Sequence, residues 1–398
     1  MMLIGIVGKA NVGKSTFFKA LTLAEVLIAN YPFATIDPNK GFAFVKVKCV
    51  DKDFNVKCNP RMGYCLNGWR FVPVEVVDVA GLVPGAHEGK GMGNKFLDDL
   101  RPADVLIHVV DIAGSTNEKG EPVPPGSYDP LFDIRFLEFE LDMWYLGLVK
   151  KGWDKFAKQV QQEKQEIAKA LVKQLSALKV SEDIVKQGIK ELNLDPSRPV
   201  EWSEEQLNDL AIFFRKKTKP IVIAANKIDL PSAKENLERA KDAFPDYPIK
   251  PCSAESELAL KEAAKKGLID YIPGESDFNI KGDLNDKQKQ ALDFIRDNIL
   301  KKWGSTGVQQ VIDSAVFNVL KYIAVFPGGV NKLSDSHGNI LPDCFLLPSG
   351  STALDFAGLI HTDLAKNFIR AIDVKTKRTV GKDHVLKHRD VIEIISNA

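Results

Sequence analysis

The sequence predicts an α/β protein built on a parallel sheet with a phosphate-binding loop, interrupted by a helical insertion and followed by a smaller β-rich region. Three observations lead to this fold class. A glycine-rich G-x-x-x-x-G-K-S segment at residues 8–15 directly follows an apolar strand-like run. Roughly a hundred residues with helical apolar spacing separate two later buried strands. Short strand-like runs around one helix then make up the end of the chain.

The glycine-rich segment has the context that a P-loop needs. Residues 2–7 are apolar and predict a buried strand, and residues 16–21 have helical character. A turn between them aims backbone N–H groups and the positive end of a helix at one phosphate chain. We expect Lys14 to reach the β- and γ-phosphates and the Ser15 hydroxyl to bind Mg²⁺. The predicted phosphate-binding residues are Gly8, Asn11, Val12, Gly13, Lys14, Ser15 and Thr16.

Composition bounds the remaining possibilities. The chain has 398 residues with 44% hydrophobic content, enough for two or three domains. Its 54 basic and 53 acidic residues leave a net charge of +1, so a polyanionic partner must be inferred from local patches. No apolar stretch approaches the length of a membrane span. We expect a soluble cytoplasmic protein with no membrane partner and no indication of DNA binding.

A second phosphate-site element follows another buried strand. Residues 71–77 alternate and then become wholly apolar, and they end in the D-x-x-G segment of Asp78 and Gly81. Behind a P-loop, this pattern predicts that Asp78 holds Mg²⁺ through water. The Gly81 N–H would meet a γ-phosphate oxygen and sense its presence.

A third element points to the nucleotide base. Residues 219–225 predict a buried strand that delivers an N-K-x-D segment, Asn226 to Asp229, at its carboxyl end. Guanine offers two adjacent donors to one carboxylate, whereas adenine offers a donor and an acceptor, so Asp229 favours GTP. We expect Asn226 and Lys227 to support the base and the P-loop. A later Cys-Ser-Ala segment would place Ser253 at the site and supply the Ala254 N–H to the guanine carbonyl.

These elements together resemble the Obg superfamily of translation-factor-related GTPases, and most of all its YchF/Obg-like ATPase branch in an archaeal or eukaryote-like version. The matching stretches are residues 31–33, 81–86, 89–97 and 360–363. The resemblance implies that Thr35 is the switch I threonine that closes over Mg²⁺ and the γ-phosphate. ATP-using members of that branch have lost the intact N-K-x-D, which this chain keeps, so the family's ATP preference is in doubt here.

The sequence offers two histidines, and no glutamine, as the group that orients the attacking water. Leu82 follows Gly81, where Ras-like GTPases place a glutamine that positions water, and a leucine cannot orient water. His87 lies in a glycine-rich segment, and His108 in a strand matches a histidine of the YchF pattern. Each is a candidate to position water or respond to pH. A solvated loop residue for His87 and a satisfied strand histidine for His108 are equally good interpretations.

Asn11 raises the question of a second cation. It resembles the asparagine by which several related GTPases bind K⁺ beside the phosphates, where the ion replaces an arginine finger. The alternative is an asparagine that only makes loop hydrogen bonds. The expected cofactors are therefore Mg²⁺ and, as a second candidate, K⁺.

The rest of the chain predicts two further parts. Helical spacing covers residues 131–149, 153–178, 182–192 and 203–217, and then residues 286–303 and 308–320. The tail predicts strands at 321–327, 339–342, 369–374 and 391–395 around a helix at 352–364, and it is similar to a TGS domain, a ubiquitin-like β-grasp module. The expected domains are a GTPase domain at 1–127 and 215–275, a helical insertion at 128–214, a helical linker at 276–318 and a TGS domain at 319–398.

Two groups of basic residues are candidate contacts for RNA, with solvated surface charge as the alternative. One lies along the second helical segment and the other in the last loops of the tail. They comprise Lys155, Lys158, Lys164, Lys169 and Lys173, and Lys375, Lys377, Arg378, Lys382, Lys387 and Arg389.

Cys49, Cys58 and Cys65 fall close together but form no C-x-x-C pair. The spacing favours ordinary reduced cysteines, because intact zinc sites usually show tighter pairs. A metal held with a fourth ligand from elsewhere and a Cys58–Cys65 disulfide are the alternatives.

The leading functional hypothesis is a switch enzyme that binds and slowly hydrolyses GTP with Mg²⁺ and engages the ribosome or RNA in one nucleotide state. A YchF-like ATPase is one alternative. The other is a nucleotide-gated RNA- or ribosome-binding module that does not hydrolyse. The sequence sets no oligomeric state.

Overall fold

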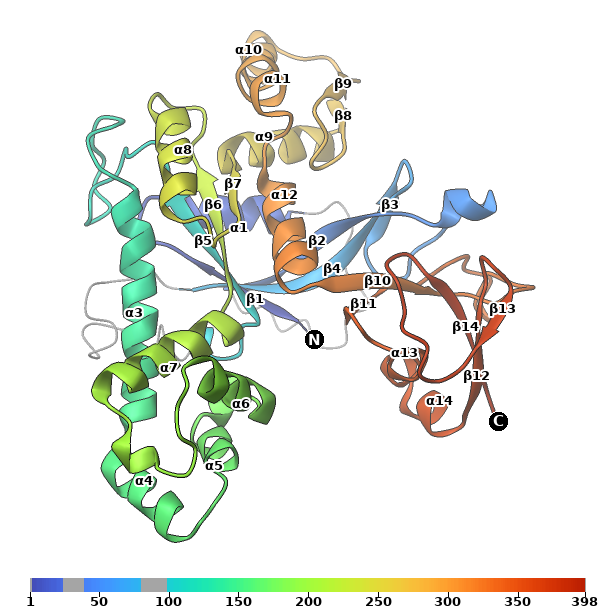
Figure 1. Ribbon diagram of the computed structural model, residues 1–398. Coiled ribbons are helices and arrows are strands. Elements are labelled where there is room, and N and C mark those ends of the chain that lie inside the picture. Colours follow the sequence, from blue (N-terminus) through green and yellow to red (C-terminus); the bar gives the residue numbers. More distant parts are fainter. Residues whose placement is uncertain (1, 24–38, 80–98, 398) are drawn as a thin grey trace.

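The computed structural model of the protein describes residues 2–23, 39–79 and 99–397. A central sheet carries helices on both faces, a group of helices projects from one end, and a second sheet lies at the other end (Figure 1). This arrangement confirms the predicted fold class of a P-loop α/β domain with a helical insertion and a C-terminal β-grasp domain.

The central sheet has the strand order expected of a P-loop domain. Its strands are β1 Leu3–Val7, β2 Lys40–Lys48, β3 Tyr64–Leu66, β4 Trp69–Asp78, β5 Val105–Asp111, β6 Ile221–Asn226 and β7 Ile249–Pro251. The order is β2-β4-β1-β5-β6-β7, with β3 also paired to β4. Strands β2 and β3 run antiparallel to β4, and the other pairs are parallel. Strands β5 and β6 are buried throughout, which explains why their sequences are apolar except for the buried His108, Asp111 and Asn226.

Two separate cores cover the two faces of this sheet. On one face, α1 Lys14–Thr22 and α12 Val308–Asp313 contribute Phe17 and Val311. On the other, α3 Leu131–Lys150 and α7 Glu204–Thr218 contribute Leu141 and Phe214. The sheet is flanked further by α8 Ala233–Ala243, α9 Ala254–Lys265 and the hairpin of β8 Ile269–Tyr271 with β9 Phe278–Ile280. The carboxyl ends of the parallel strands therefore lie at one edge of the sheet, between the helices that cover its two faces.

The helical insertion contains one helix more than the sequence predicted. Between α3 and α7 the chain forms α4 Trp153–Gln162, α5 Ile167–Gln174 and α6 Glu182–Glu191. The prediction of a single helix over 153–178 is wrong, because the backbone of Lys164 turns into the left-handed region at φ 50°. Trp153 and Trp202 stack with ring centroids 5.6 Å apart and close the helices into one core.

The predicted helices after the GTPase region are present but irregular. The first comprises α10 Asp286–Ile295, a π-helical turn at Arg296–Leu300 and α11 Lys301–Trp303. A second π-helical segment, Ser314–Val319, continues α12.

The C-terminal sheet has the order β11-β10-β14-β12-β13. Its elements are β10 Tyr322–Pro327, β11 Phe345–Pro348, α13 Ala353–Ile360, α14 Thr362–Lys366, β12 Phe368–Asp373, β13 Arg378–Val380 and β14 Val391–Ser396. The prediction of a strand at 339–342 is wrong. That apolar segment is a loop in which Leu341 is fully buried and its carbonyl accepts a hydrogen bond from the Arg70 guanidinium.

Within the described ranges, no helix combines the length and the apolar character needed to cross a membrane.

Candidate nucleotide site

The glycine-rich loop lies between the end of β1 and the start of α1, as predicted. Gly13 caps α1 with φ 90°, and its carbonyl accepts the first helical hydrogen bond from the Phe17 N–H at 2.8 Å. A Cβ atom at Gly13 would lie 2.3 Å from the Asn226 amide nitrogen. Glycine is therefore required here by both conformation and space.

Lys14 and Asp78 meet directly at the carboxyl edge of the sheet. The Lys14 ammonium forms an ion pair with Asp78 Oδ1, and both side chains are largely buried. Strands β1 and β4 bring them together, because Ile6 is in register with Asp78. The two residues predicted to bind phosphate and Mg²⁺ are thus neighbours. Ser15 is exposed in the first turn of α1 and Thr16 is partly buried beside it.

Asn226 links the P-loop to the base-binding segment. Its Nδ2 donates to the Val12 carbonyl at 2.9 Å, and its Oδ1 accepts the Ala254 N–H at 2.9 Å. The side chain is buried at the end of β6. The expected support of the P-loop by Asn226 is present. The donation of the Ala254 N–H to guanine stays a prediction, and in this structure that N–H donates to Asn226 instead.

Lys227 has a different partner from the predicted one. Its ammonium pairs with Asp111 Oδ2 at 2.9 Å and lies 3.2 Å from the Ser115 hydroxyl. The expected support of the base and the P-loop by Lys227 stays a prediction. Asp111 ends β5 next to β6, in register with Asn226, so the pair ties the two strand ends together.

Asp229 lies exposed at the mouth of the same edge. The Ser253 hydroxyl, at the N-cap of α9, lies 3.2 Å from Asp229 Oδ1 and 2.9 Å from Ser256 Oγ. Ser253 therefore orients the carboxylate that the sequence assigns to guanine.

Among the proposed catalytic residues, only Lys14 and His108 can be placed. Thr35, Gly81, Leu82 and His87 lie outside the described residues. His108 is 2% exposed on β5, and burial, with a contribution from Lys9, lowers its pKa to about 3. The imidazole is neutral near pH 7, so a response of this histidine to physiological pH finds no support. Its role in positioning water stays a prediction.

The segment after β5 makes contacts with the P-loop that the sequence analysis missed. Asn11 has φ 61°, and its Nδ2 donates to the Gly120 carbonyl at 2.9 Å. Lys9 is buried, donates to the Thr116 carbonyl at 3.0 Å and forms an ion pair with Asp133 of α3 at 2.8 Å. Lys9 occupies an unspecified position of the G-x-x-x-x-G-K-S motif, so no role was predicted for it from the sequence. The acidic Asp133 at the start of the insertion was a candidate partner, but the sequence does not show that it is buried beside the P-loop.

Lys9 and Asp133 share a third partner. The Tyr128 hydroxyl donates to Asp133 Oδ1 at 2.9 Å, and the Lys9 ammonium lies 3.9 Å from the Tyr128 ring centroid. Burial and the neighbouring Asp133 raise the pKa of this phenol above its usual value. The three side chains join the phosphate loop to the helical insertion.

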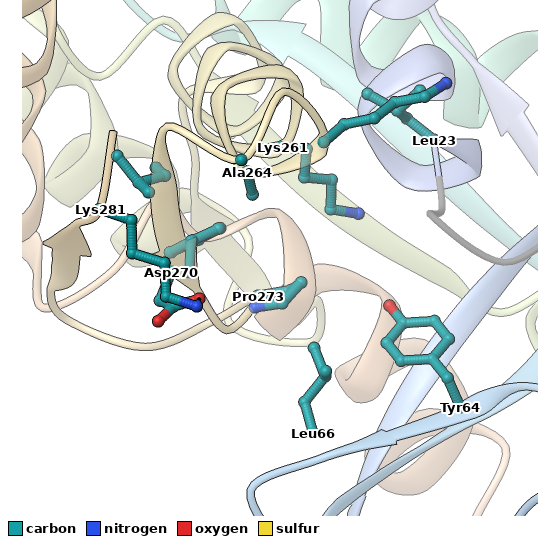
Figure 2. Close-up of a pocket in the computed structure, with 12 residues that line it drawn as sticks. Leu23, Tyr64, Leu66, Lys261, Ala264, Asp270, Pro273 and Lys281 are labelled. Atoms are coloured by element: carbon teal, nitrogen blue, oxygen red, sulfur yellow. Dashed lines mark ion pairs between the residues drawn. The ribbon is translucent and has the colours of Figure 1, made fainter. Parts of the chain in front are cut away.

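A separate cavity of about 330 Å³ lies away from this edge, and Figure 2 shows its lining. Leu23 just past α1, Tyr64 of β3 and Lys261 of α9 border it, and Lys281 pairs with Asp270 at its rim at 2.7 Å. No residue assigned to the nucleotide lines this cavity.

Two of the basic residues in the tail are used inside the molecule. Lys375 and Arg389 both pair with Asp53, at 3.0 and 2.8 Å. In the insertion, Lys169 pairs with Glu166 at 2.8 Å. Lys375 is still exposed, as are Lys377, Arg378, Lys382 and Lys387, and these last four take part in no ion pair within the part of the chain that the structure describes.

Comparison with known protein families finds matches to three parts of the chain. The family of 50S ribosome-binding GTPases matches residues 3–127. The G4 motif-containing domain of YGR210-like Obg-like GTPases matches residues 224–329, and the TGS domain matches residues 336–396.

Full-length relatives and solved structures agree with these matches. A GTP-binding protein of Methanocaldococcus jannaschii is 52% identical over the whole of both chains, and one of Schizosaccharomyces pombe is 36% identical over 88% of each. The ribosome-binding ATPase YchF of Bacillus subtilis is 29% identical over 99% of this chain and 98% of its own. A crystal structure of a GTP-binding protein from Pyrococcus horikoshii OT3 superposes with a TM-score of 0.80 at 39% identity over the whole of both chains. The chain belongs to the YchF/Obg-like family of P-loop GTPases, with a C-terminal TGS domain.

Proposed function

We propose that this protein binds GTP in preference to ATP, hydrolyses it slowly, and uses the nucleotide state to control binding to the ribosome or to RNA. The family supplies nucleotide binding at a P-loop. The preference for guanine, the slow rate of GTP hydrolysis and the ribosome or RNA as partner are proposed here.

The preference for guanine rests on the arrangement of the N-K-x-D segment and the Cys-Ser-Ala segment at the ends of β6 and β7. Asn226 bridges the Val12 carbonyl and the Ala254 N–H, and the exposed Asp229 carboxylate is oriented by Ser253. One carboxylate accepts both guanine donors, whereas adenine would set its N1 acceptor against the negative charge. Relatives named as GTP-binding proteins, at 52% and 36% identity, are consistent with this choice.

The phosphate side offers one cation and one set of metal ligands. Lys14 is already held at the P-loop and exchanges Asp78 for phosphate oxygens when nucleotide binds. A hydroxyl on Ser15 and a carboxylate on Asp78 are the oxygen donors that Mg²⁺ prefers, so these residues fit that ion, and by resemblance Thr35 joins them. Mg²⁺ would neutralise charge on the phosphates there.

We expect slow hydrolysis because the sequence has no glutamine at the position that orients the attacking water in Ras-like GTPases. Leu82 replaces a water-positioning glutamine, so attack by water is poorly oriented. His87, His108 and the Gly81 N–H are the candidate groups that act instead. If no group replaces the glutamine, the protein would bind GTP without hydrolysing it.

ATP hydrolysis is the second candidate function, because relatives that span the chain at 27–30% identity are named ribosome-binding ATPases. Asp229 is the feature that distinguishes the two. Those relatives also suggest the ribosome as partner, and the four exposed basic residues of the tail supply charge for phosphate contacts.

We further propose the division given above: a GTPase domain at 1–127 and 215–275, an insertion at 128–214, a linker at 276–318 and a TGS domain at 319–398.

Calorimetry with GTP and ATP tests the base preference. We expect GTP to bind at least tenfold more tightly, about 1.4 kcal/mol, because adenine offers the carboxylate only one donor and sets an acceptor beside it. Asp229→Asn should lose this preference and gain affinity for xanthosine nucleotides. Asp242→Asn, an exposed aspartate on α8, is the matched control. Equal dissociation constants for GTP and ATP would refute the GTP assignment and favour the ATPase.

Single-turnover phosphate release tests hydrolysis. Lys14→Ala and Ser15→Ala should each abolish Mg²⁺-dependent release, since they remove phosphate charge stabilisation and a metal ligand. Lys19→Ala, exposed on the same helix, should leave it unchanged. Wild-type rates in either P-loop variant would contradict the roles assigned. Release that is undetectable in the wild type, with and without ribosomes, would establish the non-hydrolysing module.

A further inference from the structure

Three cysteines and one aspartate, none of them assigned to the nucleotide site, converge beside β4. Cys49 directly follows β2, Asp51 begins the 3-10 helix η1 Asp51–Phe54, Cys58 lies in the loop after it, and Cys65 is in β3. Cys49 is 1% exposed, Cys58 and Asp51 are each 7% exposed, and Cys65 is half-buried. One ligand atom from each residue lies within 4.8 Å of all the others.

Separations between these atoms are close to those of a zinc tetrahedron. Zinc at its usual distances of about 2.3 Å from sulfur and about 2.0 Å from oxygen places two sulfurs roughly 3.8 Å apart and a sulfur and an oxygen roughly 3.5 Å apart. Here Cys49 Sγ and Cys58 Sγ are 3.6 Å apart, and Cys58 Sγ lies 3.4 Å from Asp51 Oδ2. Cys65 Sγ lies 4.0 Å from the same oxygen. The four groups therefore surround a space of the size that one zinc ion fills.

Backbone contacts fix the carboxylate in this orientation. Asp51 Oδ1 accepts the Lys52 N–H at 2.8 Å, which leaves Oδ2 directed at the sulfurs. In protein metal sites, a hydrogen bond to the oxygen that does not bind the metal orients a carboxylate ligand in this way.

A buried positive charge lies on the same side of the hairpin. Arg70 is fully buried and pairs with Cys65 across the β3–β4 ladder, so the two side chains share a face of the sheet. Three thiolates and one carboxylate around a divalent ion leave net negative charge, which this guanidinium offsets. Arg70 also donates to the carbonyls of Leu341 and Pro342, but neither these carbonyls nor a cluster of neutral thiols would supply a negative charge beside it.

We propose that Cys49, Asp51, Cys58 and Cys65 bind one zinc ion in a closed, structural site. Thiolate sulfur selects zinc over Mg²⁺ or Ca²⁺, and four protein ligands leave no open position for catalysis. The four ligands all come from one stretch of 17 residues, from 49 to 65.

This stretch also carries the contacts to the TGS domain. Asp53 pairs with Lys375 and Arg389, and Arg389 Nε donates to the carbonyl of Lys48, the residue directly before the stretch, at 2.8 Å. The Asn59 and Arg61 N–H groups donate to the carbonyls of Ile340 and Pro342, each at 3.0 Å. A metal that fixes the stretch therefore also fixes the surface on which the C-terminal domain docks.

Metal analysis of the full-length chain tests the proposal directly. The protein, purified with reductant and incubated with Zn²⁺, should retain one zinc per chain after desalting. Replacement by Co²⁺ should give the thiolate charge-transfer and ligand-field absorption of a tetrahedral site. Wild-type protein that retains no zinc and gives no such cobalt spectrum would overturn the proposal without any variant.

Variants assign the ligands. Cys58→Ser and Cys65→Ser should each lose the bound zinc at the same concentrations, whereas Cys344→Ser, another thiol in the same region, should keep one per chain. Unchanged nucleotide affinity shows that a variant has folded, because the P-loop lies elsewhere on the sheet. Zinc retained in both ligand variants would refute the assignment. A Cys49–Cys58 or Cys58–Cys65 disulfide in freshly prepared wild-type protein, found by mass spectrometry without reduction, would replace the metal site with a redox pair.

Loss of the metal should also loosen the domain contact. A chelator should lower the thermal midpoint of the wild type and should increase protease cleavage near the tail loops. The Cys58→Ser variant should show no further change on chelation. Equal chelator effects on the wild type and on Cys58→Ser would show that the stabilisation comes from a different ion.

Discussion

Lys14 and Asp78 hold each other at the point where phosphate and metal are expected to bind. This ion pair satisfies two largely buried charges, so nucleotide binding must exchange partners rather than create new ones. In the proposed function, the lysine would pass from the carboxylate to phosphate oxygens, and the carboxylate would become available to the metal. The pair therefore lowers the net gain from phosphate binding and keeps both groups in position.

Asn11 is the residue whose role depends most on the bound cation. Its Nδ2 donates to the Gly120 carbonyl, which leaves its Oδ1 as the atom that would contact K⁺. We predict slow intrinsic hydrolysis that K⁺ accelerates and Na⁺ does not, because a cation of suitable size supplies charge stabilisation between the β- and γ-phosphates. Phosphate release in matched K⁺ and Na⁺ buffers measures this effect. Asn11→Ala should lose the acceleration, and an unchanged K⁺ response in that variant would contradict the assignment.

His108 should make stability depend on pH. Its pKa of about 3 in the folded protein lies below the value of about 6.5 in the unfolded chain, so the unfolded state binds more protons below pH 6.5. Stability from the neutral imidazole is present above pH 6.5 and is lost as the pH falls. Urea unfolding should show the wild type losing about 2 kcal/mol more than His108→Gln between pH 7 and pH 5.

The exposed His337→Gln is the control for His108 and should behave as the wild type. Phosphate release distinguishes the two interpretations of His108. A rate that falls while the pH dependence of stability stays as in the wild type would favour the catalytic role over the buried strand histidine.

At the scale of elements, the sequence predicted what depends on local pattern and missed what depends on packing. The P-loop, the ends of β4 and β6 and the two domains that follow were accessible, because strands followed by specific polar residues have few alternatives. The break at Lys164 was not, because its left-handed backbone follows no glycine or proline signal. The Asp111 partner of Lys227 was missed because it comes from a neighbouring strand more than a hundred residues away.

The contact between the P-loop and α3 should couple nucleotide binding to the insertion. Lys9 and Asp133 form an ion pair with side chains that are each only 9% exposed. Asp133→Asn should destabilise the protein by about 3–5 kcal/mol, because it leaves a buried ammonium without its charge partner. It should also weaken GTP binding, since Lys9 adjoins the phosphate loop. Chemical unfolding and calorimetry measure the two effects.

A double variant separates the ion pair from packing. Lys9→Met with Asp133→Leu should recover most of the lost stability, because no buried charge is then left alone. Tyr128→Phe removes only the hydroxyl and should cost about 1 kcal/mol. If the double variant is as unstable as the sum of the single variants, the two residues are not coupled.

At the scale of the whole molecule, the stretch from 49 to 65 connects the nucleotide-binding sheet to the TGS domain. Asp53 pairs with both Lys375 and Arg389, and just beyond the stretch the fully buried Arg70 of β4 donates to the carbonyls of Leu341 and Pro342. The sequence analysis placed Lys375 and Arg389 in a surface patch for RNA. Their pairing with Asp53 assigns them to the domain contact instead, and the partner surface is correspondingly smaller.

The exposed remainder of that patch is the part that should bind ribosomal RNA or other RNA. Alanine replacement of Lys377, Arg378 and Lys382 should weaken ribosome co-sedimentation and flatten its salt dependence, each lost phosphate contact removing roughly one unit of slope. Intrinsic GTP hydrolysis should stay the same, because the nucleotide site lies in another domain. Lys375 is left in place, since its loss would disturb the Asp53 contact. A companion variant that replaces Lys155, Lys158 and Lys173 removes the same charge from the exposed face of the insertion. If the companion variant loses binding and the tail variant keeps it, the insertion carries the RNA contact and the tail charges are only solvated.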